Sequence, residues 1–328
     1  MRGTYESSFG YFTLKIMKEI TINKSDACGR LDKYLKKLMP AASSGFIYKM
    51  LRKKNIVLNG KKAEGNELLG EGDVIKIFFS DETYAAMTAG REKAVNENSK
   101  NDNSKLPPVV YEDEDILILD KPSGMLSQSD GSGEASVNDC LRSFYGDSGV
   151  YKPSVCNRLD RNTSGLIMCA KTYAGSRFFD ECIKTHCVRK FYSAVCEGRI
   201  DKPGTLEGYL YKDEVTNKVS IKRSGDDAHF IKTIYRPVKD LQGYTELEVE
   251  IISGKSHQIR AHLSSIGHPL AGDKKYGGHP YKGKHTQLLR AVRLEFPESV
   301  PETFNESQKE ILERLLNRYP DGKVSIKG

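Results

Sequence analysis

One short stretch of the chain brings a carboxylate and two guanidinium groups together before a turn. Residues 157–166 read Asn-Arg-Leu-Asp-Arg-Asn-Thr-Ser-Gly-Leu, so Arg158 and Arg161 flank Asp160. Nearby positive charge favours an ionised carboxyl group, and we therefore expect Asp160 to be a base or nucleophile at neutral pH. The Thr-Ser-Gly that follows can fix the loop before a buried strand over 165–171. Taken alone, Arg-Leu-Asp-Arg more often marks a surface ion-pair cluster than a catalytic site.

A second run, residues 253–263, reads Ser-Gly-Lys-Ser-His-Gln-Ile-Arg-Ala-His-Leu. It predicts a strand that leads into a polar turn and a short helix, which would deliver Arg260 and the histidines to one region. Its Gly-Lys-Ser resembles the end of a nucleotide-binding phosphate loop. That loop needs a glycine five residues before Gly254, and Val249 stands there instead, so we exclude it.

A third run, residues 189–195, reads Arg-Lys-Phe-Tyr-Ser-Ala-Val. It places Tyr192 in the middle of an apolar strand predicted over 190–197. A tyrosine in such a position more often belongs to the hydrophobic core than to a site, and the strand by itself leaves both readings open.

Together the three runs resemble, in their order, the bacterial ribosomal-RNA pseudouridine synthases of the RluA type. Asp-Lys-Pro-Ser-Gly at 120–124 looks like the opening Lys-Pro-x-Gly turn of that family. Gly-His-Pro at 267–269 and Gly-Asp-Lys-Lys-Tyr-Gly at 272–277 look like its downstream segment. The resemblance covers roughly residues 109–298.

The resemblance implies an isomerase that acts on uridine in RNA: the glycosidic C–N bond breaks, the uracil turns, and a C–C bond forms. Asp160 would be the catalytic carboxylate, either by attack on the anomeric carbon or by removal of a ribose proton. Arg260 would pair with Asp160 and keep it ionised, and Tyr192 would stack on the uracil. The resemblance implies neither a metal nor a cofactor.

The same resemblance places RNA contacts beside the catalytic residues. The expected RNA-binding side chains of this region are Arg158, Arg161, Lys255, His257 and Gln258. Arg158 is a candidate for filling the hole left by a flipped uridine or for binding a phosphate. The family often has His where this chain has Asn157, and Lys255 stands where arginine is common.

The excess positive charge of the chain lies near its N-terminus. Eleven Lys and Arg residues against two acidic ones stand between Lys24 and Lys62, an excess of nine in a chain of net charge +7. Such a cluster favours a polyanionic partner. Two short helices and a small sheet, with Arg-Leu-Asp-Lys-Tyr-Leu at 30–35, resemble the alpha-L RNA-binding domain of small-subunit ribosomal proteins. The predicted RNA contacts are Arg30, Lys33, Lys36, Lys49, Arg52, Lys53, Lys54 and Lys61.

The order of the predicted elements favours an α+β fold. We expect a disordered extension (1–16), an alpha-L domain of small α/β type (17–80), a flexible linker (81–107) and a catalytic domain (108–328) of mixed, mainly antiparallel sheets with flanking helices. The predicted helices lie over 31–38, from 44, and over 135–144, 174–184 and 304–319. The predicted strands lie over 74–79, 115–122, 165–171, 190–197 and 245–252, with a hairpin at Asn59-Gly60.

Composition excludes several other classes. No apolar run is long enough to span a bilayer, and no signal peptide opens the chain. The seven cysteines form no Cys-x-x-Cys pair, which favours reduced thiols in a cytoplasmic protein, and Cys182, His186 and Cys187 lack the second half of a zinc site. We expect a monomer with RNA, most readily large-subunit ribosomal RNA, as its partner. Modification of transfer RNA and a non-catalytic role in ribosome assembly remain open, whereas a sugar hydrolase would need a second carboxylate.

Overall fold

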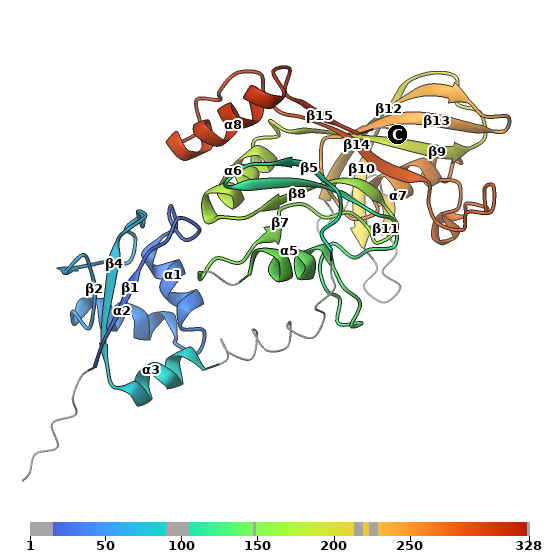
Figure 1. The fold of residues 1–328 in the computed structure, drawn as a ribbon. Helices are drawn as coiled ribbons and strands as arrows, with labels where there is room; N and C mark the ends of the chain where they lie inside the picture. The colour runs from blue at the N-terminus through green and yellow to red at the C-terminus, as the bar shows by residue number, and fades with distance from the viewer. Residues whose placement is uncertain (1–15, 90–104, 147–148, 213–218, 223–228, 327–328) are drawn as a thin grey trace, which may run out of the picture. The chain divides into compact units, whose positions relative to one another are not determined.

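A computed structural model describes residues 16–89, 105–146, 149–212, 219–222 and 229–326 of the 328-residue chain (Figure 1). The chain divides into two compact units, residues 1–100 and 101–328. The disordered extension predicted over 1–16 lies outside the described residues except for Ile16, where the first strand begins. Each unit is described here by itself.

The first unit is a four-stranded antiparallel sheet with helices. Its elements are β1 (Ile16–Thr21), α1 (Leu31–Leu38), α2 (Ser44–Arg52), β2 (Ile56–Leu58), β3 (Lys61–Lys62), β4 (Val74–Phe79) and α3 (Asp81–Thr88), with strand order β1-β4-β2-β3. Leu31, Leu35 and Leu38 of α1 are buried at helical spacing. Asn59 and Gly60 both have positive φ, the geometry that a two-residue hairpin requires.

Helix α3 is a correction to the flexible linker that we expected over 81–107. The Ser80 hydroxyl accepts a hydrogen bond from the Thr83 amide, and Asp81 and Glu82 stand in the first turn, where the helix dipole favours acidic side chains. The sequence predicted a polar linker because the segment has few bulky apolar residues, and this prediction did not take into account that Ser80 can cap a helix. Residues 90–104 lie outside the described part.

The second unit is built on one large sheet. Its strands are β5 (Val109–Glu112), β6 (Ile116–Lys121), β7 (Ser154–Val155), β8 (Ser164–Ala170), β9 (Arg189–Glu197), β10 (Gly204–Lys212), β11 (Val219–Lys222), β12 (His229–Asp240), β13 (Tyr244–Ile251), β14 (Leu289–Glu295) and β15 (Lys323–Ser325). The order is β11-β10-β12-β13-β9-β14-β8-β6-β5, with β15 beside β14 and β7 beside β8. Among the described strands only β14 and β8 pair in parallel. The prediction of an α+β fold with mainly antiparallel sheets is confirmed.

Helices flank this sheet (Figure 1). They are α5 (Val137–Tyr145), α6 (Tyr173–Lys184), α7 (Gln258–Ser265), the short 3-10 helix η1 (Lys274–Tyr276) and α8 (Glu306–Arg318). One hydrophobic core runs through β6, β8, β9, β13, β14, α6 and α8. Helix α6 packs on β8 and α8, whereas α7 packs on β11 and β12 near η1. In the described part of the chain, no helix has the length and apolar character needed to cross a membrane.

Candidate active site

Asp160 lies on the loop between β7 and β8, and its neighbours fix this loop from both sides. Leu159 is buried in the core, its amide donates to the Ser127 hydroxyl (3.1 Å), and its carbonyl accepts from the same hydroxyl (2.8 Å). At the start of β8, Gly165 has φ +107°, and a Cβ there would lie 2.1 Å from the Ala291 carbonyl oxygen. Only glycine permits this close approach, which sets where the loop joins the sheet.

A fully buried lysine holds the other side of the loop. Lys121 is 0% exposed at the end of β6, and its Nζ donates to the carbonyl oxygens of Pro122 (3.0 Å), Met125 (2.8 Å) and Arg161 (3.0 Å). Burial lowers the pKa of Lys121 to about 8, against the opposing attraction of Asp160, so the side chain is still mainly an ammonium ion at pH 7. Lys121 therefore ties the 122–125 turn to the residue that follows Asp160.

The carboxylate of Asp160 pairs with Arg260 from helix α7. Arg260 Nη1 donates to Asp160 Oδ2 at 2.9 Å, while Arg260 Nε and Nη2 donate to the two carboxylate oxygens of Asp273 at 2.6 and 2.8 Å. Asp273 and Arg260 are buried, whereas the Asp160 side chain is 21% exposed and can be reached from solvent. Burial opposes the charge on Arg260, but the hydrogen bonds and charges of the two carboxylates outweigh it and raise the pKa of Arg260.

His257 and Tyr276 complete this side of the site. His257 Nε2 lies 3.7 Å from Asp160 Oδ2, and its Nδ1 lies 2.9 Å from the Tyr276 hydroxyl, which also accepts from the Val219 amide. The Arg260 guanidinium lies over the Tyr276 ring, 4.9 Å from its centroid. Burial lowers the pKa of His257 despite Asp160, so the imidazole is neutral at pH 7. His257 is the residue just before α7, and its φ of +57° is rare for a residue other than glycine.

Tyr192 lies in the hydrophobic core on β9, between Val249 of β13 and Ala291 of β14. Burial, and then the charge of Asp160, raise the pKa of Tyr192, so its hydroxyl stays protonated. The sequence left open whether Tyr192 belongs to the core or to the site. In the structure Tyr192 lies in the core and interacts electrostatically with Asp160, so its position is compatible with both roles.

The two arginines next to Asp160 in the sequence do not pair with it in the described structure. Arg161 turns away: its guanidinium binds Glu134 and donates to the Gly124 carbonyl at 3.2 Å. Arg158 is exposed. The expectation that these neighbours hold the carboxylate ionised is corrected, because the partner is Arg260, as the family resemblance implied. Asn157 accepts a hydrogen bond from the Met168 amide (2.7 Å), so its side chain anchors the loop to β8.

The remaining predicted contacts of this region divide into exposed and buried groups. Lys255 is exposed in the turn before α7. Gln258 is buried: its amide group donates to the Lys232 carbonyl and the Thr233 hydroxyl, and its oxygen accepts from Ser253 and Lys255. Both ends of Gln258 are thus occupied. The prediction that Gln258 binds RNA is corrected, because its role is to shape the turn.

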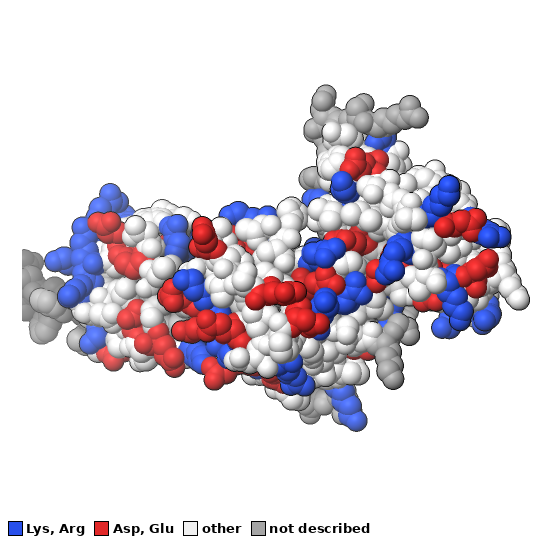
Figure 2. Space-filling model, turned by 90° about the horizontal axis from the view of Figure 1, so that it is seen from above, with Lys and Arg blue, Asp and Glu red and all other residues white. Residues whose placement is uncertain are grey.

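All eight basic residues predicted to bind RNA in the first unit are exposed. Arg30 pairs with Asp32, and Lys36 donates to the carbonyls of Pro40 and Ala42. The other six form no ion pair within the described residues. In the face seen in Figure 2, Lys and Arg side chains gather at the left edge of the first unit, and both units also present acidic side chains on this face.

Asp273, Tyr276 and Lys121 are the site residues that sequence reasoning did not single out. Each lies in a motif that the resemblance quoted, Lys121 in the 120–124 turn and the other two in 272–277. The motif indicates which segment belongs to the site. Only the fold shows which of its side chains contact Arg260 or the loop that carries Asp160. No three His, Cys, Asp or Glu side chains among the described residues form a group that could hold a metal ion.

Known protein families match segments of both units. A family model described as RNA pseudouridylate synthase matches residues 115–265, and an S4 domain model matches residues 29–75. Ribosomal large subunit pseudouridine synthase C of Rickettsia bellii is 33% identical over 265 residues, which cover 79% of this chain and 85% of that protein. Ribosomal large subunit pseudouridine synthase D of Yersinia pestis is 28% identical over 290 residues, 85% of this chain and 83% of that protein.

A solved structure, human RNA pseudouridylate synthase domain containing 1, has a TM-score of 0.49 and 22% identity, and the match covers 66% of this chain and 97% of that one. The assignment of the chain to a family rests on the sequence relatives. The chain belongs to the RNA pseudouridine synthase family, isomerases that convert uridine to pseudouridine in RNA. Its first unit contains the S4 domain, which was expected from the basic helices and the hairpin.

Proposed function

We propose that this enzyme isomerises specific uridines of large-subunit ribosomal RNA, with Asp160 as its catalytic residue. The single observation that carries the proposal is the partly exposed Asp160 carboxylate, which the buried Arg260–Asp273 pair holds in place. The names of the relatives, ribosomal large subunit pseudouridine synthases C and D, support the choice of RNA. This choice ranks above transfer RNA and above a non-catalytic assembly factor, since both alternatives lack a comparable observation.

The chemistry proposed for Asp160 follows from its surroundings. An ionised carboxylate attacks the anomeric carbon of the flipped uridine or removes a ribose proton, and either step allows the C–N bond to break. Arg260 orients the carboxylate by the 2.9 Å hydrogen bond. Tyr192, with a protonated hydroxyl, presents its ring for stacking on the detached uracil, which turns and bonds through C5.

The other groups position the RNA. The exposed basic side chains of the S4 domain bind phosphates, and this contact does not depend on sequence. Arg158, exposed next to Asp160, fills the hole left by the flipped nucleotide or binds a phosphate beside it. The protein acts as a cytoplasmic monomer that needs neither a metal nor a nucleotide cofactor.

The test is Asp160→Asn, with Asp201→Asn, an exposed carboxylate of the same unit, as its matched control. Release of tritium from C5-labelled uridine in a large-subunit RNA transcript reports the reaction, because the new C–C bond replaces the C5–H bond. Asp160→Asn should abolish release and keep RNA affinity within about tenfold of wild type, and Asp201→Asn should change neither. Turnover by Asp160→Asn would refute the role of Asp160, and wild-type turnover on transfer RNA alone would refute the choice of RNA.

A further inference from the structure

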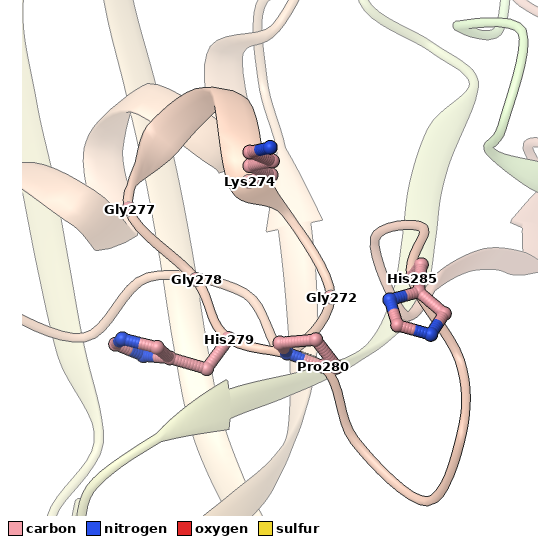
Figure 3. Close-up of a pocket in the computed structure, with 7 residues that line it drawn as sticks. All are labelled: Gly272, Lys274, Gly277, Gly278, His279, Pro280 and His285. Carbon is pink, nitrogen blue, oxygen red and sulfur yellow. The ribbon is translucent and has the colours of Figure 1, made fainter.

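A pocket beside the candidate active site has no assigned role. Its volume is about 420 Å³, and it is lined by Gly272, Lys274, Gly277, Gly278, His279, Pro280 and His285. Lys274 stands on η1, and His279 and His285 stand on either side of Pro280 (Figure 3). The volume lies within the range of about 300–1,000 Å³ that is typical of ligand pockets. It has room for a phosphate group together with its ribose.

The segment that forms this pocket carries mainly positive charge, and its one acidic residue, Asp273, is paired with Arg260. From Lys274 to Arg290 the sequence holds five Lys or Arg residues and two His, and no Asp or Glu. Arg290 is balanced by Asp120 at 2.8 Å. The side chains of Lys274, Lys282 and His285 are exposed and form no ion pair within the described part of the chain. An anionic ligand would therefore meet uncompensated charge here.

Two of the glycines that line the pocket pack closely on other backbone segments. A Cβ at Gly278 would lie 2.0 Å from the Leu270 carbonyl oxygen, and a Cβ at Gly272 would lie 2.3 Å from that of Thr286. Only glycine permits these close approaches, which fix the path of the backbone beside the pocket. Glu197 accepts hydrogen bonds from the His279 amide and, at 3.0 Å, its ring Nδ1, which orients the imidazole.

The donor set suits an anion and not a metal ion. No metal-binding group of three His, Cys, Asp or Glu exists among the described residues, and Glu197, whose carboxylate contacts the pocket residue His279, is already paired with it. Lysine ammonium and imidazole N–H groups are hydrogen-bond donors that bind phosphate oxygens. The same segment turns Asp273, the residue before Lys274, inward to Arg260.

From this geometry we infer that the pocket binds a phosphodiester group of the RNA substrate close to the target nucleotide. The inference rests on the proposed function. In the 272–285 segment, Asp273 binds Arg260, and the residues that line the pocket bind the RNA backbone. The phosphate contact fixes the register of the strand relative to Asp160.

The experiment measures binding of the unmodified large-subunit RNA transcript by Asp160→Asn protein, so that turnover does not interfere. Lys274→Gln with His285→Gln is added to this protein, and His279 with its Glu197 contact is left intact. The matched control adds Lys184→Gln with His186→Asn, an exposed Lys and His at the end of α6. Asn tolerates the positive φ of His186.

The pocket variant should lower the slope of log affinity against log salt by about 0.7, the value for one phosphate of a single strand, which corresponds to about fivefold weaker binding in 0.1 M salt. The control should match the parent. An unchanged slope in the pocket variant, or an equal fall in the control, would overturn the inference. The two proposals can fail separately. If the wild-type protein forms no pseudouridine but the pocket variant still lowers the salt slope, the proposed function is refuted and the inference of an anion-binding pocket is retained.

Discussion

Substitution of Asp273 by Asn tests whether Arg260 owes its orientation to a residue that never meets the substrate. Asp273 provides two of the three hydrogen bonds that Arg260 makes to carboxylates, and Asp160 provides the third. Asparagine keeps the size of the side chain, but its NH₂ group faces a guanidinium N–H and its charge is gone. Arg260 then loses the partner that fixes it.

Two effects of Asp273→Asn can be estimated. Removing one partner of a buried ion pair costs about 3–5 kcal/mol, which lowers Tm by about 6–20 °C for a unit of this size. The bond from Arg260 to Asp160 joins two charged groups and is worth about 1.5–3 kcal/mol. Its complete loss in the transition state corresponds to about a 10- to 150-fold fall in rate. We expect a fall of about tenfold or more, within that limit.

The assay is the single-turnover rate of tritium release with saturating RNA, at a temperature where both variants are folded. Asp115→Asn is the matched control, because Arg314 lies between Asp113 and Asp115 much as Arg260 lies between Asp160 and Asp273. The control should lower Tm and leave the rate unchanged. A rate for Asp273→Asn within threefold of the control would refute the reasoning, because Arg260 would then be oriented without Asp273.

Two further predictions concern RNA binding and pH. Replacing Arg52, Lys53 and Lys54 by Gln should lower the salt slope of RNA binding by about 2, since each single-strand phosphate contact contributes about 0.7, and an unchanged slope would exclude these side chains from the interface. Burial lowers the pKa of His262 to about 4, so between pH 6.5 and 4 the unfolded chain binds a proton that the folded chain does not. Stability should therefore fall by about 3 kcal/mol as pH drops through this range, and His262→Gln, which keeps a polar group near Thr233, should flatten that part of the curve in urea titrations. An equally steep curve for His262→Gln would contradict the assignment.

Much of the fold could be predicted from periodicity. Strand β4 alternates buried and half-buried residues as predicted over 74–79, and the apolar run of β6 is buried between its neighbours. The Asn59-Gly60 turn has the expected backbone. Helix α3 was missed because its sequence has no apolar face, and only the Ser80 cap distinguishes it from linker.

The site was harder to predict than the fold. Asp160, Tyr192 and Arg260 were singled out because they stand in ordered motifs. The family resemblance implied the pairing of Asp160 with Arg260, whereas proximity in sequence alone suggested the two neighbouring arginines. Arg161 is the next residue and yet binds Glu134, whereas Arg260 is a hundred residues away and binds Asp160. The direction of a side chain on a loop cannot be predicted from the sequence alone. For the same reason Gln258, which is buried, was predicted to contact RNA.

The shared arginine has a consequence for charge balance during the reaction. If Asp160 bonds covalently to the sugar, its negative charge disappears, and a guanidinium with no other partner would be left as an uncompensated buried cation. Asp273, sealed from solvent and bonded to two other nitrogens of Arg260, keeps that cation neutralised throughout. The reacting carboxylate can thus change its charge state while the pair behind it stays neutral, so the protein need not rearrange to accommodate the intermediate.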